Sequence, residues 1–379
     1  MAAQPLTLTW PHALAARLRA QRLHPATAVT SRDPVALLRA MGGAQAQEAE
    51  AGLLSAGVRA APEAGHTAAA LEAARVDART LVRTWAMRGT LHLLPSEDAA
   101  WIVPFLAPRL IRGSITRRQQ LGFDEDQSAR AVALIRAALA EHGPLTRAEL
   151  RAALAARGLP SEGQGTVHLI YRAVLEGVCI NGPLREGAET LALLAEWAPA
   201  AVFAPLPEAE TLARLARLYL NAFAPAAPAD LAAWAGITLG EARRGFAAIA
   251  GELREVTVAG AAHWLIAAEA DQLLAKTHRP AVRLLPRFDT YLMGYRTRDQ
   301  ALPPAHKARV FPGGGMIHPT LVVDGAVLGA WQWVRGKAVL GLNVQPFAPL
   351  RPALRQALPS LAEALAAFLD TEPLTLTVD

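Results

Sequence analysis

Cysteine, lysine and long apolar runs are scarce in this chain of 379 residues. Cys179 is the single cysteine, so no intramolecular disulfide can form, and its apolar neighbours in GVCINGP favour a core position over a nucleophile. No run of ~18 apolar residues occurs, so no membrane span is predicted. The start, MAAQPLTLTW, lacks the basic and apolar regions of a secretory signal. We therefore expect a cytoplasmic location.

Several motifs that carry chemistry are also absent from the sequence. There is no cluster of cysteine and histidine and no HExxH pattern, so a metal site is not predicted. GxSxG, the motif around a hydrolase serine, is missing. FPGGGM at 311–316 lacks the strand, GxGxxG and helix context of a dinucleotide site. We expect no cofactor.

The chain is nevertheless long and apolar enough to build substantial cores. Its length suggests roughly two to four domains, and 52% of its residues are hydrophobic. The net charge is +5, the sequence pI is about 9.8, and three of the 38 basic residues are lysines. Two explanations stay open: a codon-biased composition, or a polyanionic partner whose phosphates arginine contacts in pairs.

One plan, short helices followed by a hairpin, recurs along the chain. In the first segment, 1–122, Asp33 or Ser31 caps a helix over 33–41 that Gly42-Gly43 ends. Further helices are predicted over 46–60 and 66–76, and a hairpin over 80–95. Three helices and a hairpin outline a winged helix.

Three further segments complete the predicted organisation. Segment 123–205 has a helix at 128–143, a capping box from Thr146 to Glu149, a helix at 166–178 and a strand at 179–184. Segment 206–285 has a helix-turn-helix with a second capping box from Thr238 to Glu241, then a hairpin at 255–266. Segment 286–379 has a hairpin turning at Asp324-Gly325, a third strand at 336–344, a helix at 350–370 and a closing strand at 373–378.

These patterns predict a mainly α fold with small β wings, of the α+β class. It consists of three tandem winged-helix modules and a C-terminal β-rich element. In winged helices the third helix usually enters the DNA groove. The third helix of the second module, TVHLIYRAVLEGV, is largely apolar, so it is predicted to be packed instead.

Several stretches in order along the chain resemble one family: LLRAMGGAQAQ, RTWAMRGTLHLLPSEDAAWI, LYLNAFAPAAPADLAAWAGI, LLPRFDTYLMGYRTRD and LVVDGAVLGAWQWVR. They are similar to the bacterial tandem winged-helix family that includes the AlkZ-like DNA glycosylases. The resemblance implies excision of alkylated bases, crosslinked ones included, without a metal. It also implies a catalytic Gln-x-Gln motif in the first winged helix, which Gln45-Ala46-Gln47 matches.

Two neutral amides suffice for this chemistry if the leaving group is already labile. Glycosidic cleavage passes through an oxocarbenium-like sugar that a water molecule must reach. A purine alkylated at N3 or N7 is cationic and departs neutral, so it needs no general acid. Gln45 and Gln47 would hold the water and stabilise the sugar cation, mainly by positioning.

The spacing of the two glutamines constrains the local backbone. On a regular helix residues two apart point ~200° apart, whereas Gly42-Gly43 permits an irregular entry. We therefore expect Gln45 at a helix start, with both amides facing one cleft. Glu48 is either the true base or a solvated residue near a helix N-terminus.

Other residues support the DNA-binding interpretation. Thr90 and His92 alternate on one strand, and His92 is either a phosphate or glutamine contact or a core histidine. Asp289 is either a carboxylate near the cleft or a structural partner of an arginine, and Tyr291 or Tyr295 is a candidate to stack on a base. The candidate DNA contacts are Arg83, Arg88, Arg109, Arg112, Arg117, Arg118 and His318.

The sequence thus predicts a DNA repair glycosylase that hydrolyses the N-glycosidic bond of alkylated N7 or N3 purines, with interstrand crosslinks as further candidate substrates. Its partner is double-stranded DNA, which would associate it with the nucleoid. No membrane partner or oligomer is implied, and limited base flipping is expected. Two alternatives remain: a non-catalytic DNA-binding protein such as a transcription regulator, and a protein-interaction module.

Overall fold

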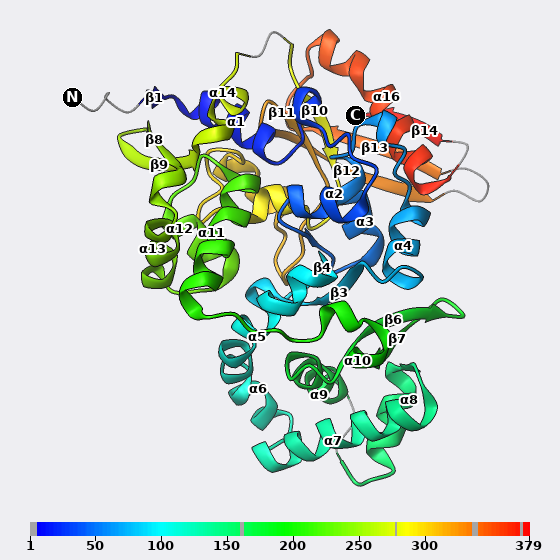
Figure 1. Cartoon of the computed structure of the whole chain (residues 1–379). Coiled ribbons are helices and arrows are strands. Elements are labelled where there is room, and N and C mark those ends of the chain that lie inside the picture. The colour runs from blue at the N-terminus through cyan, green and yellow to red at the C-terminus, as the bar shows by residue number, and fades with distance from the viewer. Residues whose placement is uncertain (1–5, 160–162, 277–278, 336–339, 372–373) are drawn as a thin grey trace. The chain divides into compact units, whose positions relative to one another are not determined.

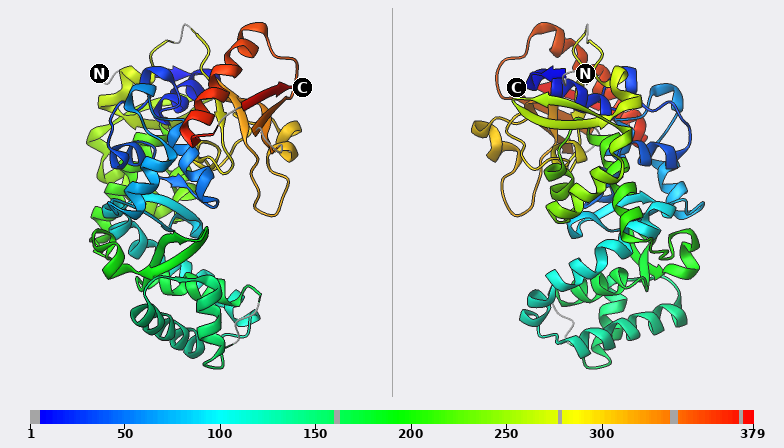
Figure 2. Two further views of the ribbon diagram at one scale, coloured as in Figure 1. Left: turned by 90° about the vertical axis from the view of Figure 1, so that its right-hand side faces the viewer. Right: turned by 60° about the vertical axis from the view of Figure 1, so that its left-hand side comes forward.

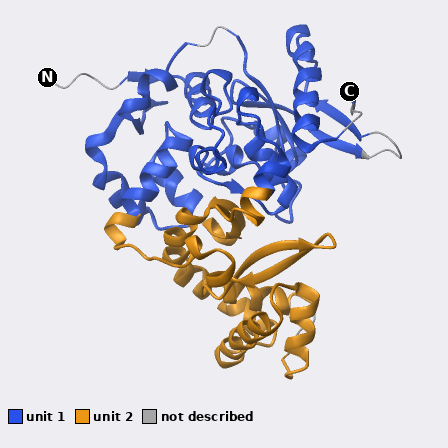
Figure 3. Ribbon diagram, turned by 45° about the vertical axis from the view of Figure 1, so that its right-hand side comes forward, with its two compact units in different colours: residues 1–72, 212–379 blue, residues 73–211 orange. Residues whose placement is uncertain are grey.

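The structure is a computed structural model that describes residues 6–159, 163–276, 279–335, 340–371 and 374–379 (Figure 1). The chain forms two compact units. Unit 1 combines residues 1–72 with 212–379, and unit 2 is the continuous stretch 73–211 (Figure 3). No helix in the described ranges has the length and apolar character that crossing a bilayer requires.

Unit 1 contains most of the helices. Asp33 caps α2 as predicted, because its carboxylate accepts hydrogen bonds from the backbone of Val35 at 2.9 Å and of Ala36 at 3.3 Å. The helices that lie in unit 1 or run across its boundaries are α1 (Trp10–Ala20), α2 (Pro34–Ala40), α3 (Ala49–Gly57), α4 (Ala68–Val76), α11 (Glu208–Phe223), α12 (Pro228–Ala235), α13 (Leu239–Ala248), α14 (Ala270–Leu273), α15 (Lys307–Val310) and α16 (Pro352–Leu369).

A five-stranded sheet organises the C-terminal part of unit 1. Its neighbours are antiparallel except for the last, parallel pair. Asp324 and Gly325, with φ of 48° and 88°, form the predicted two-residue turn. Helix α16 contacts both edge strands (Figure 2). The strands in sheet order are β10 (Val282–Leu285), β11 (Thr320–Val323), β12 (Ala326–Arg335), β13 (Leu340–Pro346) and β14 (Leu374–Val378).

Predicted strands in this sheet extend beyond what the structure describes. The third strand was predicted over 336–344, and residues 336–339 lie outside the described part. Pro373, the predicted start of the closing strand, lies outside it as well.

A smaller sheet accompanies the helix-turn-helix of unit 1. Strand β1 (Leu6–Leu8) pairs in parallel with β8 (Leu253–Val258), which forms a hairpin with β9 (Ala261–Ile266). The predicted capping box between α12 and α13 is confirmed: the Glu241 carboxylate accepts from the Thr238 backbone at 2.7 Å, and the Thr238 hydroxyl accepts from the Glu241 backbone at 3.2 Å.

Unit 2 contains the predicted hairpin over 80–95, the predicted helices of segment 123–205 and the predicted strand at 179–184, which pairs with residues 188–193 in a second hairpin. The predicted capping box at Thr146 and Glu149 is present, and Gly143 ends α7 as predicted. The helices are α5 (Ser96–Gly113), α6 (Ile115–Gln120), α7 (Glu125–His142), α8 (Arg147–Ala155), α9 (Gly165–Leu175) and α10 (Leu194–Trp197). The strands are β3 (Leu81–Trp85), β4 (Leu91–Pro95), β5 (Leu145–Thr146), β6 (Cys179–Arg185) and β7 (Ala188–Leu193).

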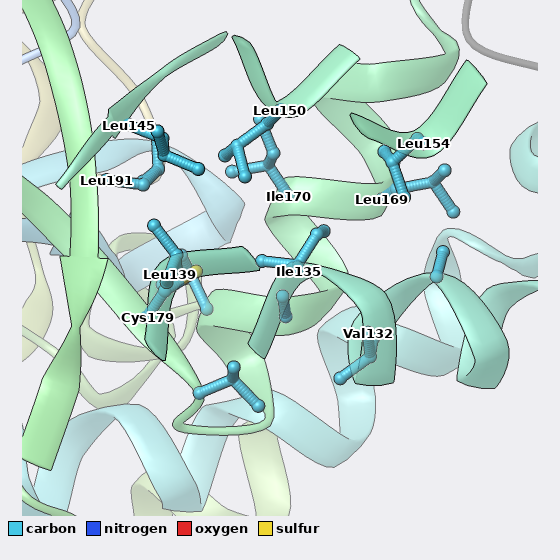
Figure 4. Close-up of a cluster of buried hydrophobic side chains, with 14 of the residues drawn as sticks. Val132, Ile135, Leu139, Leu145, Leu150, Leu154, Leu169, Ile170, Cys179 and Leu191 are labelled. Carbon is cyan, nitrogen blue, oxygen red and sulfur yellow. The ribbon is translucent and has the colours of Figure 1, made fainter. Parts of the chain in front are cut away.

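The core of unit 2 lies between α7, α8 and α9 and the β5–β7–β6 sheet (Figure 4). Ile135, Leu139 and Leu169 are almost fully buried there. Cys179 belongs to this cluster with 1% of its surface exposed, and burial raises the pKa of its thiol to about 12. The preference for a core cysteine over a nucleophile is confirmed. Helix α9 contributes Leu169, Ile170 and Ala173, so the prediction that it is packed is also confirmed.

The mixed α+β class is confirmed. The number of winged-helix modules and the division at 122, 205 and 285 stay predictions, since the two compact units describe the chain at a coarser level. The boundary at residue 72 falls inside the first predicted segment.

Candidate active site

The backbone around the two glutamines turns sharply before it enters the motif. Helix α2 ends in a Schellman motif, with the Gly42 amide bonded to the Arg39 carbonyl at 3.2 Å and the Gly43 amide to the Leu38 carbonyl at 2.8 Å. Gly42 and Gly43 have φ of 75° and 81°, a region that favours glycine. The predicted irregular entry is therefore confirmed.

The prediction that Gln45 begins a helix is wrong. Gln45 ends the short strand β2 (Ala44–Gln45), and Gln47 lies in a bend before α3 begins at Ala49. The two glycines turn the chain into an extended segment, so helical geometry is not available to the motif. Because Gln45 ends a strand and Gln47 lies in a bend, neither helix nor strand periodicity fixes the relative direction of their side chains.

The two amides occupy different environments. Gln45 is 4% exposed, whereas Gln47 is exposed. A buried carboxamide is desolvated and held by its surroundings, while an exposed one can adapt to a ligand. The prediction that both face one cleft stays a prediction.

Helix α3 packs directly on the motif backbone. A Cβ atom at Gly52 would lie 2.6 Å from the Cβ of Ala46 and 3.0 Å from its Cα. Only glycine permits this approach without a shift of the backbone. The position of the motif is therefore coupled to the position of α3.

A buried polar network also anchors the C-terminal part of α3. Arg59 and Asp289 form a bidentate ion pair with both distances at 2.8 Å, and their side chains are 0% and 3% exposed. The Ser55 hydroxyl donates to the same carboxylate at 2.7 Å, and Arg59 donates to the Gln21 amide oxygen at 2.7 Å. The interpretation of Asp289 as the structural partner of an arginine is confirmed.

A pocket of about 580 Å³ begins immediately after the motif. Glu48, the residue after Gln47, lines this pocket, and its carboxylate pairs with Arg287 at 2.9 Å. Glu48 is the N-cap residue of α3, although its side chain does not cap the helix. The pocket is lined by Glu48, Glu50, Ala51, Leu54, Pro286, Arg287, Arg309, His318, Pro319, Ala330, Trp331, Gln332, Trp333 and Gln345.

Two tryptophans supply the aromatic wall of this pocket. Trp331 and Trp333 follow each other on one side of β12, with ring centroids 5.1 Å apart in an edge-to-face arrangement. The Trp331 indole donates to the Leu285 carbonyl at 2.9 Å, which fixes its ring. Neither tryptophan is among the residues predicted from the sequence, although WQW in a strand shows the required spacing of two.

His318 also lines this pocket, and its assignment as a DNA contact stays a prediction. It is half-buried, and its Nδ1 lies 3.2 Å from the Arg309 carbonyl oxygen. Tyr291 and Tyr295 do not offer a stacking surface. Both are buried, and their hydroxyls donate to the carbonyls of Gly325 and Phe223. The suggestion that either stacks on a base is wrong.

Thr90 and His92 belong to the hairpin of unit 2. Thr90 precedes β4, and its hydroxyl donates to the Met87 carbonyl at 3.1 Å. His92 is 1% exposed, and its Nδ1 lies 2.9 Å from the Thr90 carbonyl oxygen. Burial, with a contribution from Arg88, lowers the pKa of His92 to about 3. With 1% of its surface exposed His92 is not accessible to a phosphate, so that suggestion is wrong, while the suggestion that it orients a glutamine stays a prediction.

Two of the candidate DNA contacts are structural residues. Arg83 is 6% exposed and pairs with Glu189. Arg118 is 2% exposed, donates to the Ser114 hydroxyl at 2.6 Å and pairs with Glu125 at 3.3 Å. A phosphate contact would require breaking these pairs, so their assignment as DNA contacts is corrected.

Three other candidates gather in one place in unit 2. Arg88, Arg109 and Arg117 line a pocket of about 450 Å³ together with His168 and Tyr171. Arg117 is exposed and donates to the Gln164 side chain at 2.7 Å. Arg112 is exposed on α5 but does not line this pocket. The pocket offers cations and an aromatic ring from residues distant in sequence.

Within the described ranges, no group of three or more histidine, cysteine or acidic side chains is arranged to hold a metal ion.

Comparison with known proteins assigns the class. A family model described as DNA glycosylase AlkZ-like matches residues 38–368. The chain therefore belongs to the AlkZ-like DNA glycosylase family, and by that membership it is a DNA N-glycosylase that acts on DNA. This confirms the family inferred from the sequence.

One relative and one solved structure are similar to nearly the whole chain. An interstrand DNA cross-link repair glycosylase of Streptomyces sahachiroi is 32% identical over 357 residues, which cover 88% of this chain and 90% of that protein. The structure of Streptomyces sahachiroi DNA glycosylase AlkZ matches with a TM-score of 0.80 and 26% identity, over 99% of this chain and 100% of that chain.

Proposed function

We propose that this glycosylase hydrolyses the N-glycosidic bond of purines alkylated at N7 or N3 in double-stranded DNA, interstrand crosslinks included. The observation that carries the proposal is the placement of Gln45 and Gln47. Gln45 ends the short strand that follows Gly42-Gly43, Gln47 lies in the next bend, and α3 packs on Ala46 between them through the contact at Gly52. The crosslink substrate is further supported by the name of the Streptomyces sahachiroi relative, an interstrand DNA cross-link repair glycosylase.

The chemistry divides between the two amides according to their burial. Gln45, held in a desolvated environment, fixes the direction of the attacking water, because its oxygen accepts a hydrogen bond while its NH₂ donates elsewhere. Gln47, which is exposed, adapts to the sugar and stabilises its developing positive charge through the amide oxygen. The cationic base leaves neutral, so no general acid is required.

The aromatic pocket next to the motif suits the bulk that an alkylating agent adds to a base. Trp331 and Trp333 offer an apolar wall, while Arg287 and Glu48 form a polar edge. A lesion that projects into a groove would reach such a pocket without full extrusion of the base. We therefore expect limited flipping, unlike the mode of most glycosylases.

Three winged-helix modules, at 1–122, 123–205 and 206–285, are proposed to position the duplex. The helix pair α12–α13 followed by the β8–β9 hairpin has the element order of such a module. In unit 2, Arg88, Arg109 and Arg117 supply cations for the phosphate backbone.

Release of 7-methylguanine from methylated duplex DNA tests this proposal. Wild type is expected to release the base, and Gln45→Ala and Gln47→Ala each to lower the rate by about 100-fold or more. Gln272→Ala is the matched control, because this glutamine is exposed on α14. Sequence-selective duplex binding without release would instead indicate a regulator. Weak, salt-insensitive DNA binding would indicate a protein-interaction module.

A further inference from the structure

A second pocket in unit 1 is separate from the chemistry described so far. Its volume is about 330 Å³, and its walls come from α3, the following loop, β10 and α16. Leu54, Leu284, Leu365 and Phe368 line it and are themselves largely buried. The pocket therefore offers an apolar interior in the lower part of the ~300–1,000 Å³ range that small-molecule sites occupy.

Arg283 places one cation in this apolar wall. It is half-buried on the edge strand β10, and within the described ranges it forms no ion pair. Within those ranges the guanidinium of Arg283 donates one hydrogen bond, to the carbonyl of Val282 at 2.9 Å. A guanidinium carries five N–H donors in a planar fork. Most of the donors of Arg283 therefore have no protein acceptor.

The charge of Arg283 persists at neutral pH. Burial, with a smaller contribution from Arg59, lowers its pKa to about 10. The other charged residue of the pocket is Glu63, which is exposed. A permanent cation beside apolar side chains is complementary to an anion with an apolar body.

We propose that this pocket binds a small organic carboxylate, with the carboxylate on Arg283 and an apolar chain or ring against Leu365 and Phe368. A carboxylate matches the guanidinium fork in a bidentate arrangement. A phosphodiester lacks the apolar body that the rest of the pocket would cover. Leu54 lines both this pocket and the pocket next to the glutamine motif, so the occupant contacts the helix that positions the motif.

Calorimetric titration of the full-length protein with octanoate tests this proposal. Saturable binding with one site is expected, and octanamide, which has the same chain without the charge, is expected to bind at least tenfold more weakly. Arg283→Gln should weaken octanoate binding about tenfold or more and leave octanamide unchanged. Arg351→Gln is the matched control, because this arginine is exposed at the start of α16 and does not line the pocket.

A second variant keeps the test valid if Arg283→Gln does not fold. Ala364 is exposed on α16 and lines the pocket, so Ala364→Trp fills the space without disturbing the core. It should abolish octanoate binding. The proposal is overturned if wild type shows no saturable binding, if either variant retains wild-type affinity, or if inorganic phosphate or duplex DNA displaces octanoate at equal concentration. Base release is measured separately, so its failure leaves this result unaffected.

Discussion

Gly52 and Ala46 approach so closely that a Cβ atom at position 52 would lie 2.6 Å from the Ala46 Cβ. Gly52→Val is therefore expected to displace the motif and to lower base release about 100-fold, because ~1 Å of misplacement is enough for such a loss. Single-turnover kinetics measure the effect. Gly251→Ala is the control, since nothing lies within 4 Å of its added Cβ. Equal rates in the two variants would show that the contact does not position the motif.

Breaking the buried pair of Arg59 and Asp289 should destabilise unit 1. Asp289→Ala leaves an uncompensated guanidinium inside the protein, so the free energy of unfolding is expected to fall by about 3–5 kcal/mol. Urea denaturation measures this change. The double variant Arg59→Met/Asp289→Leu should recover most of the loss, because neither charge remains. If the double variant is no more stable than Asp289→Ala, the loss comes from something other than the unpaired charge.

Glu48→Gln separates a supporting residue from a general base. The pair with Arg287 is 35–44% exposed, so solvent screens it and its loss costs less than about 1 kcal/mol. If Glu48 only supports the motif, base release should fall less than about fivefold. A fall as large as that of Gln45→Ala would assign the proton-accepting role to Glu48.

Stability should depend on pH through His92. Its folded pKa of about 3 lies below the ordinary value near 6.5, so only the unfolded chain binds this proton between those limits. The free energy of unfolding is unaffected by this proton above pH ~6.5. It decreases as the pH falls toward 3, by up to ~1.4 kcal/mol per pH unit. Denaturation of wild type and His92→Gln at several pH values should show a shallower dependence in the variant. Parallel curves would contradict the buried, neutral histidine.

The arginines of unit 2 should divide into two groups. Arg117→Ala is expected to lower the salt slope of duplex binding by ~1, because one phosphate contact is lost. Arg118→Ala should leave the slope unchanged and lower the thermal midpoint, because this residue holds Ser114 and Glu125. The opposite pattern would mean that the ion pairs of Arg118 open when DNA binds.

Local features of the fold were predictable because their determinants lie within a few residues. Asp33, the capping boxes at Thr146 and Thr238, and the turn at Asp324-Gly325 each depend on neighbouring positions. The family resemblance likewise identified the glutamine motif, because the residues that carry it are contiguous in the sequence.

Features that depend on distant residues were not predictable. The partner of Arg59 lies 230 positions away in the sequence, and Glu48 meets Arg287 across a similar separation. The sequence shows that Arg83, Arg117 and Arg118 are cations, but not that two of them are buried in ion pairs. The residues of α3 follow closely and favour a helix at Gln45, whereas the turn at Gly42-Gly43 leads into a strand.

The long sequence separation between Arg59 and Asp289 sets an order in which the parts of the protein can fold during synthesis. The continuous stretch 73–211 emerges from the ribosome well before Asp289 is added. Domains generally fold as units while the chain grows. Unit 2 can therefore fold on the nascent chain before Arg59 can pair with Asp289. The polar network that anchors α3 can form only late in translation. The glutamine motif is therefore expected to reach its final position after unit 2 has folded.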